Sequence, residues 1–272
     1  MIPVEFDYEL AGSVEHAIEL LGGRDGAKVL AGGHSLLPAM RLRIARPGLL
    51  VDVGRLDELR YVREADGGLE IGALTRHHDL VHDGLLRKHC PLLAHTASLV
   101  GDPQVRHRGT IGGSVAHGDP ASDLPTVLVA LDAELVARGP GGERTIPAAD
   151  FFRGVFETAL GPQDVLTEIR VPAATGTYVK FNRRAQDWAT VGVAVGRVNG
   201  DVRVGLTSMG PIPMRAAAVE AALVAGASPA QAAEQAAEGT DPPSDTSGSA
   251  DFRRHLARVL VRRALEEEQA SR

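Results

Sequence analysis

The chain has 272 residues, which fits one large domain or two modest ones; 44% of the residues are hydrophobic and 24% are charged. This composition is ordinary for a soluble globular protein. The net charge of −6 and the lack of a long Lys/Arg cluster exclude the electrostatic footprint of a nucleic-acid-binding protein. No apolar stretch approaches the roughly 20 residues that span a bilayer. Residues 1–7 lack the features of a signal peptide, so we expect a cytoplasmic protein without a membrane span.

The chain contains a single cysteine, Cys90. One cysteine cannot form an internal disulfide framework. It also cannot supply the four thiolates of a cysteine-ligated iron–sulfur cluster. Any such cluster that works with this protein must therefore be held by another chain.

The first fifty residues predict one amphipathic helix and several short apolar segments. Ser13 is a suitable N-cap for residues 14–21, whose apolar side chains recur at i, i+3, i+4 and i+7 before Gly22-Gly23 ends the helix. The apolar runs after it are short and bounded by glycine or proline, which favours buried strands. We expect strands at 28–31 and 49–53, and a short helical turn at 35–40.

The next hundred residues are predicted to mix strands with short helices. Asp66-Gly67-Gly68 is a hairpin signal, Thr75 is expected to cap one helix, and Ser122 or Asp123 to cap another. Pro91 stands at the permitted first position of a helix. The expected strands are 61–62, 69–73, 133–137 and 165–171, and the longer helices are 91–100 and 124–131. Because strands and helices do not alternate regularly, the predicted class is α+β.

The last hundred residues have a different pattern. Asn199-Gly200 is the strongest short hairpin signal, and two alanine-rich helical stretches follow it. The expected strands are 191–198 and 202–207, and the expected helices are 214–225 and 252–268. Pro172 and Gly176 mark a boundary, which divides the chain into domains 1–174 and 175–272.

Two Gly-Gly segments are the clearest candidates for ligand binding: Ala31-Gly32-Gly33-His34-Ser35 and Thr110-Ile111-Gly112-Gly113-Ser114. Successive glycines let several backbone N–H groups converge, and a backbone without Cβ atoms can approach a ligand closely. Two such loops facing each other would hold a diphosphate. The alternative is that each pair only marks a tight turn. Neither segment matches the Walker A pattern or G-x-G-x-x-G.

Two histidines are spaced as metal ligands can be. His78 and His82 stand at i and i+4 on an expected helix. This spacing can chelate a metal, but no Glu general base lies between them and no third ligand is identifiable. We therefore expect a solvated helix face and no metal site.

Further motifs follow the glycine segments in order. The first segment continues through Leu36-Leu37-Pro38-Ala39-Met40-Arg41-Leu42-Arg43. The second is preceded by Val105-Arg106-His107-Arg108-Gly109 and followed by His117 to Pro125. The later motifs are Lys180-Phe181, Arg183-Arg184-Ala185, Trp188-Ala189, Met209-Gly210-Pro211 with Arg215, and residues 249–256. Together they resemble the flavoprotein (medium) subunit of molybdenum hydroxylases, the relatives of carbon monoxide dehydrogenase and xanthine dehydrogenase. The resemblance spans nearly the whole chain.

The resemblance implies a fold and a cofactor. The fold would be a PCMH-type FAD-binding region, related to vanillyl-alcohol-oxidase-like enzymes, followed by a smaller domain of antiparallel sheet plus helices that is CO dehydrogenase flavoprotein C-terminal-like. Both glycine segments would wrap the FAD pyrophosphate and ribityl regions. The implied FAD-binding residues are Ala31, Gly32, Gly33, His34, Ser35, Leu36, Thr110, Ile111, Gly112, Gly113, Ser114, Asp123, Leu166, Lys180 and Trp188.

Three of these residues have structural alternatives. Asp123 would accept hydrogen bonds from FAD hydroxyls, because an ionised carboxylate only accepts, or it is a helix N-cap. Lys180, with Leu166, matches positions that line the flavin and adenine portions, or it is an exposed strand lysine. Trp188 would stack near the isoalloxazine, or it belongs to the core.

One departure from the family pattern is modest. Many relatives have Asn where Ser114 stands, so a hydroxyl replaces one amide donor and FAD binding is expected to stay intact. The related hydroxybenzoyl-CoA reductase flavoprotein carries an extra cluster in a cysteine-bearing loop. With only Cys90 available, this chain is expected to lack that cluster.

The resemblance also implies a role in a larger enzyme. Electrons would leave a molybdenum–pterin site on a large subunit, pass through [2Fe–2S] centres on a small subunit, and reach FAD on this chain, which hands them to an external acceptor. The complex would be a dimer of heterotrimers. The cofactor carries the redox chemistry, so no residue is predicted to be catalytic. The alternatives are a free-standing FAD-dependent oxidoreductase with its own small organic substrate, and a flavin-free scaffold subunit.

Overall fold

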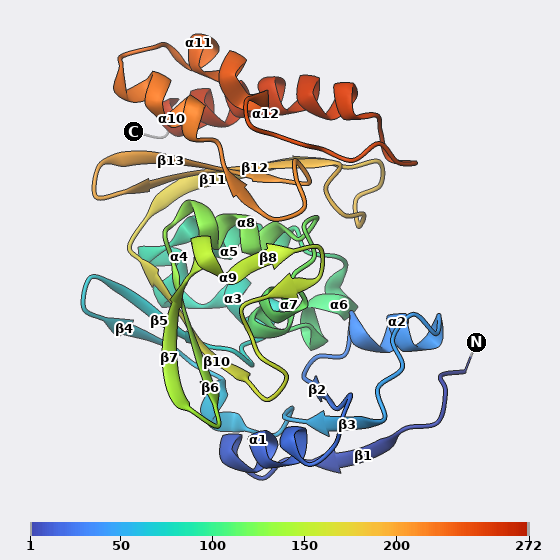
Figure 1. Ribbon diagram of the computed structural model, residues 1–272. Helices are drawn as coiled ribbons and strands as arrows, with labels where there is room; N and C mark the ends of the chain where they lie inside the picture. Colours follow the sequence, from blue (N-terminus) through green and yellow to red (C-terminus); the bar gives the residue numbers. More distant parts are fainter. Residues whose placement is uncertain (1, 271–272) are drawn as a thin grey trace.

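The computed structural model describes residues 2–270. At one end of the molecule, a small parallel sheet carries a helix on one face (Figure 1). The strands lie in the order β1 (Asp7–Leu10), β3 (Leu49–Asp52) and β2 (Lys28–Leu30), and the helix is α1 (Val14–Gly22). Ser13 caps α1 as predicted, with its Oγ accepting from the His16 amide at 3.1 Å. The predicted helical turn after β2 is α2 (Leu36–Arg41).

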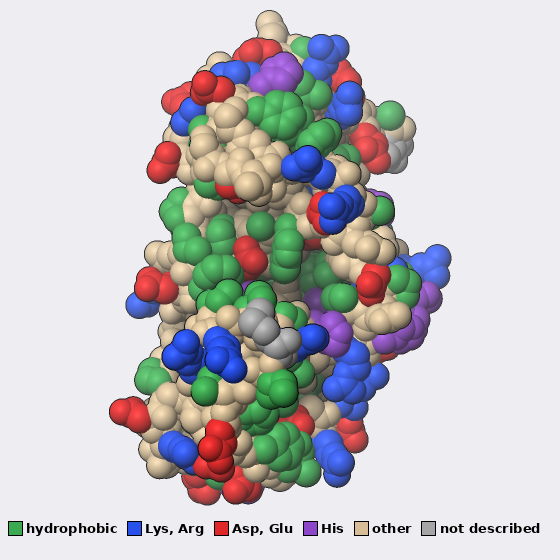
Figure 2. Space-filling view, turned by 90° about the vertical axis from the view of Figure 1, so that its right-hand side faces the viewer, with side chains coloured by type: hydrophobic (Ala, Val, Ile, Leu, Met, Phe, Trp, Pro, Cys, Tyr) green, Lys and Arg blue, Asp and Glu red, His purple; other side chains and the backbone are tan. Residues whose placement is uncertain are grey.

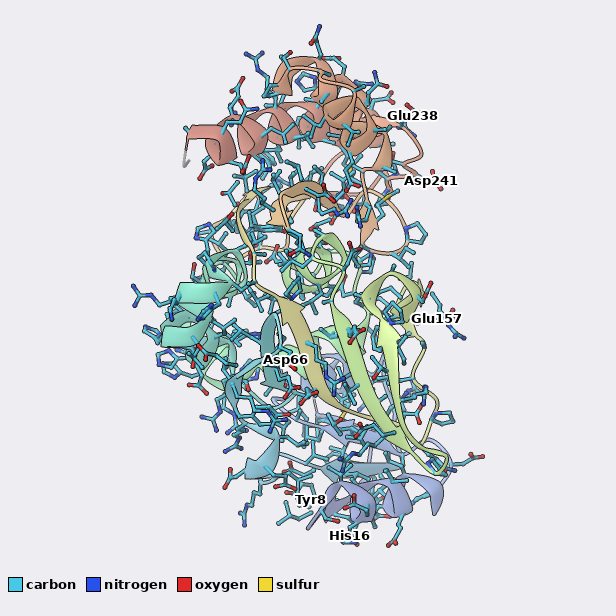
Figure 3. All side chains as sticks on the ribbon, turned by 90° about the vertical axis from the view of Figure 1, so that its left-hand side faces the viewer. Tyr8, His16, Asp66, Glu157, Glu238 and Asp241 are labelled. Atoms are coloured by element: carbon cyan, nitrogen blue, oxygen red, sulfur yellow. The ribbon has the colours of Figure 1, made fainter. Side chains whose placement is uncertain are left out.

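The middle of the molecule is an antiparallel sheet with helices packed beside it (Figure 1). The strand order is β4 (Val62–Ala65), β5 (Gly68–Gly72), β10 (Val165–Pro172), β6 (Glu134–Gly139) and β7 (Gly142–Pro147). Asp66 lies in the β4–β5 turn, as labelled in Figure 3. A short helical turn, η1 (Asp57–Leu59), connects this sheet to the first one.

Short helices and a two-stranded hairpin complete the middle part. Their apolar side chains form one core with those of the sheet, including Leu80, Leu93, Leu124 and Ile169. The helices are α3 (His77–His82), α4 (Gly84–His89), α5 (Pro91–Ser98), α6 (Pro103–Arg108), α7 (Ile111–His117), α8 (Asp123–Ala130) and α9 (Ala148–Phe151). The hairpin is β8 (Phe152–Gly154) with β9 (Glu157–Thr158).

The C-terminal part is a four-stranded antiparallel sheet between two helical layers (Figure 1). Its strands are β11 (Thr175–Phe181), β12 (Val191–Val198), β13 (Asp201–Thr207) and β14 (Met214–Arg215). One face carries α10 (Ala217–Val224), α11 (Pro229–Ala233), η2 (Glu234–Ala237) and α12 (Ala250–Ala270), and the other contacts α5 and α8. Asn199 and Gly200 both have positive φ, 51° and 93°, as the predicted tight turn requires.

Three local predictions were wrong. Thr75 does not cap α3, because Arg76 occupies the N-cap position and the Thr75 hydroxyl donates to the Tyr61 carbonyl at 3.0 Å. Residues 214–215 form β14 instead of beginning a helix, because pairing with β13 overrides their helical propensity. The second Gly-Gly segment, which was expected to be a loop, is not one. It follows α6 and forms the first turn of α7, with Thr110 as the N-cap.

Candidate cofactor-binding site

A cavity of about 1080 Å³ lies where the three parts of the fold meet. Its walls come from the end of β2 and the start of α2, from α7 and the β8–β9 hairpin, and from the segment after β11. Figure 2 looks at the side that carries α2 and shows a hollow across the middle of the molecule, bordered by hydrophobic side chains. All predicted site residues line the cavity except Ile111, whose side chain is buried in the core.

The first glycine segment is shaped by a close approach of two backbone segments. A Cβ atom at Gly32 would overlap the carbonyl oxygen of Arg108 and come within 2.8 Å of the Gly109 Cα. Gly33 has a φ of +73°, which favours glycine. This contact places residues 31–35 against the chain just before the second glycine segment, so the structure brings the two predicted segments together.

The same segment presents unused hydrogen-bond donors. Among the described residues, the backbone N–H groups of Gly32, Gly33, His34 and Ser35 have no protein acceptor. The Nδ1 atom of His34 lies 2.9 Å from the Gly32 carbonyl oxygen, which fixes the imidazole over the loop. Successive free amides in a turn form a concave anion-binding surface. The first segment therefore has the donor pattern that was predicted for a diphosphate site.

The second segment contributes in a different way. Its amides are already used, because Gly112 donates to the Ala73 carbonyl, Gly113 to the Thr110 hydroxyl and Ser114 to the Thr110 carbonyl, at 2.9, 3.1 and 3.0 Å. A Cβ on Gly113 would lie 3.9 Å from the Ala31 Cβ. This segment thus gives the cavity a smooth wall of small residues close to the first segment, with the Ser114 side chain as an available hydroxyl.

Asp123 and Lys180 form a buried ion pair in the cavity wall. The Lys180 Nζ atom lies 2.9 Å from Asp123 Oδ2 and 2.8 Å from the Leu99 carbonyl oxygen, and the two side chains are only 6% and 5% exposed. Lys180 is therefore not an exposed strand lysine. Asp123 is the first residue of α8 and Ser122 is its N-cap, so the capping alternative for Asp123 was also wrong.

Hydrogen bonds between buried hydroxyl groups continue from this ion pair into the interior of the protein. The fully buried Tyr178 donates to Asp123 Oδ1 at 2.7 Å, and its Oη lies 3.0 Å from Thr207 Oγ1, which is 2.7 Å from Thr126 Oγ1. Burial raises the pKa of Asp123, while the Lys180 ammonium and the Tyr178 hydroxyl limit that rise. Burial and the Asp123 carboxylate raise the pKa of Tyr178, so its hydroxyl keeps its proton and acts as a donor.

Trp188 and Leu166 lie on different walls. Trp188 is 55% exposed on the connection between β11 and β12, so it does not belong to the core. Its indole borders the cavity and is free to pack against a ligand. Leu166 lies on β10 and is nearly buried, which gives the cavity a fixed apolar patch.

Sequence patterns missed His77, a buried histidine in the cavity wall. Burial, reinforced by Arg106 and His34, lowers its pKa to about 4, so the imidazole is neutral at physiological pH. Its Nδ1 is buried without a hydrogen-bond partner among the described residues. Gly109 packs against the ring, since a Cβ there would lie 2.8 Å from the His77 Cδ2. No local motif marks His77, because its partners come from distant segments.

The histidine pair on α3 lies on the surface. The rings of His78 and His82 have centroids 4.4 Å apart, and His78 stacks on His107 at 3.9 Å. The Nδ1 atom of His82 is 2.8 Å from the His78 carbonyl oxygen. Within residues 2–270, no group of three or more His, Cys, Asp or Glu side chains is placed to share a metal ion.

Two known protein families match this chain over nearly all of its length. Residues 4–174 match the model of the FAD binding domain in molybdopterin dehydrogenase, and residues 176–268 match that of the CO dehydrogenase flavoprotein C-terminal domain. The chain belongs to the FAD-binding medium-subunit family of carbon monoxide dehydrogenase and xanthine dehydrogenase. This confirms the resemblance and the fold class predicted from the sequence.

Individual relatives match this medium subunit along almost its whole length. The carbon monoxide dehydrogenase medium chain of Hydrogenophaga pseudoflava is 44% identical over 280 residues, with 97% of each chain covered. The glyceraldehyde dehydrogenase medium chain of Sulfolobus acidocaldarius is 37% identical over 279 residues, covering 98% of this chain and 99% of that one. The solved carbon monoxide dehydrogenase from H. pseudoflava that lacks the Mo-pyranopterin moiety matches with a TM-score of 0.95, at 44% identity and 99% coverage of both chains.

FAD is the cofactor of this medium subunit, which makes the chain part of an FAD-dependent oxidoreductase and rules out the flavin-free scaffold. The residues present fit the cofactor, because the cavity combines free amides for an anion with a buried carboxylate for hydroxyl donors and an accessible indole for a flat ring. No helix of the described chain is long and apolar enough to cross a membrane.

Proposed function

We propose that this medium subunit relays electrons from [2Fe–2S] centres of a small partner subunit, through its FAD, to an external acceptor. The partner would receive them from a large molybdopterin-binding subunit, in a cytoplasmic dimer of heterotrimers. The observation that carries the proposal is an FAD cavity in a chain whose only cysteine, Cys90, is fully buried. Burial raises the pKa of this thiol to about 11. A chain without thiolate ligands requires a partner to carry the clusters.

The relatives support an assembly of this kind. A 6-hydroxypseudooxynicotine dehydrogenase of Paenarthrobacter nicotinovorans is named as a complex, and its similar chain is one subunit. The relatives named for carbon monoxide and for glyceraldehyde match 97% and 98% of this chain, although the substrates in their names differ. We infer that substrate selection lies on a partner subunit and that this chain supplies the flavin.

Each part of the cavity wall has a proposed role toward FAD. The free amides of residues 32–35 would bind the pyrophosphate, with Thr110 to Ser114 forming the facing wall. Asp123 would accept from FAD hydroxyls while Lys180 neutralises its charge, since a carboxylate can accept several hydrogen bonds at once. Trp188 would stack near the isoalloxazine. When bound, FAD supplies the electron-transfer chemistry.

We also propose that the chain divides into an FAD-binding domain, residues 1–174, and a C-terminal flavoprotein domain, residues 175–272. The ranges of the two family matches and the start of β11 at Thr175 support this division. Both domains contribute to the cavity, because Asp123 and Lys180 lie on opposite sides of the boundary.

The proposed pyrophosphate site is tested by Gly32→Ala with Gly84→Ala as its matched control. A Cβ at Gly32 meets the backbone of residues 108–109, whereas a Cβ at Gly84 meets nothing within 4 Å. We expect Gly32→Ala to weaken FAD binding about tenfold or more, which corresponds to about 1.4 kcal/mol, and Gly84→Ala to leave it unchanged. Flavin absorbance during FAD titration of the purified chain measures both. Equal affinities would remove residues 32–35 from the proposed site.

The electron relay is tested separately. The FAD-loaded chain is mixed under anaerobic conditions with the reduced [2Fe–2S] subunit of its own complex, and loss of flavin absorbance is followed. We expect the flavin to be reduced by this partner and not by small organic substrates added to the isolated chain. Reduction of the flavin by an organic substrate alone would favour the free-standing oxidoreductase and would contradict the proposed electron relay.

A further inference from the structure

Arg253 is a buried charge in the motif of residues 249–256. It lies in the first turn of α12 and is only 3% exposed. Its Nη2 atom donates to both carboxylate oxygens of Asp245 at 2.8 Å, and its Nη1 atom donates to the Thr190 carbonyl. Its Nε atom is buried without a hydrogen-bond partner among the described residues. Because burying a guanidinium in this way costs free energy, its presence indicates a requirement beyond the stability of α12.

The connection between β11 and β12, residues 182–190, carries Trp188 to the cavity. Trp188 is 55% exposed, so the core does not hold its indole, and the position of the indole depends on the backbone that carries it. The carbonyls of the next two residues both accept from buried side chains. Ala189 accepts from the Ser208 hydroxyl at 2.8 Å, and Thr190 accepts from Arg253.

Ser208 holds this connection from an uncommon backbone conformation. Its φ is +60°, a left-handed value that few residues with a side chain adopt. Its amide donates to the Pro120 carbonyl at 3.0 Å, just before α8. Such conformations persist where the surrounding structure fixes them, and they cluster at functional sites. Ser208 and Arg253 thus fix the backbone beside Trp188 from two different elements.

The turn before α12 contacts the other end of the same connection. Arg183 Nη1 donates to the Thr246 carbonyl at 3.0 Å, and Phe181 packs edge-to-face against Phe252 with ring centroids 5.9 Å apart. Figure 1 shows the segment before α12 running beside the β11–β12 connection. We call residues 245–253 the clamp. The clamp contacts the connection at both ends, although none of its residues lines the FAD cavity.

We propose that Arg253 is a positioning residue for Trp188, and that the clamp sets where the indole packs against the bound cofactor. The inference rests on the proposed stacking of Trp188 near the isoalloxazine. A planar guanidinium donates in fixed directions, so the one side chain holds both the Asp245 turn and the backbone of Thr190. The C-terminal helix therefore acts on the cofactor site from outside the cavity.

The alternative is that Arg253 only stabilises the C-terminal domain. Both roles predict that loss of the buried guanidinium lowers the unfolding free energy. Only the positioning role predicts that its effect on FAD affinity passes through Trp188. A double-mutant cycle between the two residues separates the two roles, because an effect that passes through Trp188 disappears when the indole is absent.

The test measures the FAD affinity of the full-length chain by flavin absorbance, for Arg253→Met, Trp188→Ala and the double variant. Arg254→Met is the matched control, because Arg254 is the next residue of α12 and pairs with the exposed Asp251. Asp245→Asn breaks the same contact at a half-exposed carboxylate and replaces Arg253→Met where that variant is unfolded. Urea unfolding shows which variants are folded.

Trp188 is the only tryptophan, so intrinsic fluorescence reports on this indole directly. In the FAD-free chain, time-resolved anisotropy should show a larger amplitude of nanosecond local motion in Arg253→Met and Asp245→Asn, and wild-type motion in Arg254→Met. FAD affinity should fall about threefold or more in Arg253→Met, in keeping with the loss of one aromatic stacking contact. It should not fall further when Trp188 is already Ala.

Three outcomes would overturn the inference. Unchanged anisotropy in both clamp variants would show that Arg253 does not position Trp188. An equal loss of FAD affinity in the wild-type and Trp188→Ala backgrounds would assign Arg253 to stability alone. Wild-type FAD affinity in Trp188→Ala itself would remove the proposed stacking, and with it the effect of the clamp on the cofactor.

Discussion

The buried pair of Lys180 and Asp123 gives the sharpest energetic prediction. Replacing Lys180 with Met removes the ammonium that lies 2.9 Å from Asp123 Oδ2 and 2.8 Å from the Leu99 carbonyl oxygen. Both side chains are almost fully buried, so the carboxylate is left without its counter-charge in a low-dielectric site. Breaking a buried pair in this way costs roughly 3–5 kcal/mol. We expect the unfolding free energy of the FAD-free chain to fall by about that amount at neutral pH.

The loss of unfolding free energy in the Lys180→Met variant should depend on pH in a defined direction. Burial raises the pKa of Asp123, and Lys180 limits the rise, so removing Lys180 moves the folded-state pKa further above the unfolded value of about 3.9. At pH values between the unfolded-state pKa and the folded-state pKa of Asp123, the folded chain binds more protons than the unfolded chain, so its stability falls as pH rises. The variant should therefore be closest to wild type near pH 4, where the carboxyl is protonated, and furthest from it near neutrality.

Urea unfolding across this pH range measures the effect, with Lys88→Met at an exposed lysine of α4 as the control. The control should stay within about 0.5 kcal/mol of wild type. Asp123→Asn in the Lys180→Met background removes the unpaired charge and should recover part of the loss. A deficit below about 1 kcal/mol, or one that Asp123→Asn does not reduce, would refute the reasoning.

Three further outcomes follow from single residues. Cys90 should resist alkylation at about pH 8 in the folded chain and react after unfolding, because burial raises its pKa to about 11; rapid native labelling would contradict this. FAD should quench the fluorescence of Trp188, the only tryptophan, and Trp188→Phe should abolish the signal. The Arg144 hydrogen bond lowers the pKa of Asp164, so Asp164→Asn should lower the unfolding free energy above about pH 4 and match wild type once acid protonates the carboxyl. Urea titrations at several pH values check the last outcome.

Features that depend on neighbouring residues were predictable from the sequence. The Ser13 cap and the spacing of apolar residues place α1, and Asn199-Gly200 places the β12–β13 turn, because both depend on interactions within a few residues. The first glycine segment was also predicted as a loop, and it does form a loop after β2 with free amides. In each case the energy that decides the structure is local.

Features that depend on distant residues were not predictable in this way. The second glycine segment becomes a helix because Thr110 caps it and because the Gly112 amide donates to the carbonyl of Ala73, the residue just after β5. In the sequence Tyr178 is an ordinary strand residue. Only the folded structure brings it to Asp123, which is fifty-five positions away in the chain. His77 likewise becomes a neutral buried group only after Gly109 closes on its ring. Tertiary packing decides these environments, and a single amino-acid sequence contains no local signal for them.

The Lys180–Asp123 ion pair bridges the two proposed domains and also lines the cofactor cavity. Cofactor binding and the packing of the two domains against each other are therefore linked. Asp123 begins α8 and Leu99 follows α5, whereas Lys180 and Tyr178 lie on β11 beyond the proposed boundary. If the halves separated, Asp123 would lose its counter-charge and its hydroxyl donor, and the cavity would lose a wall. A ligand that fills the cavity stabilises the joined state, because it binds that state and not the separated one. FAD would therefore act on this chain both as its redox group and as part of what holds the C-terminal sheet against α5 and α8.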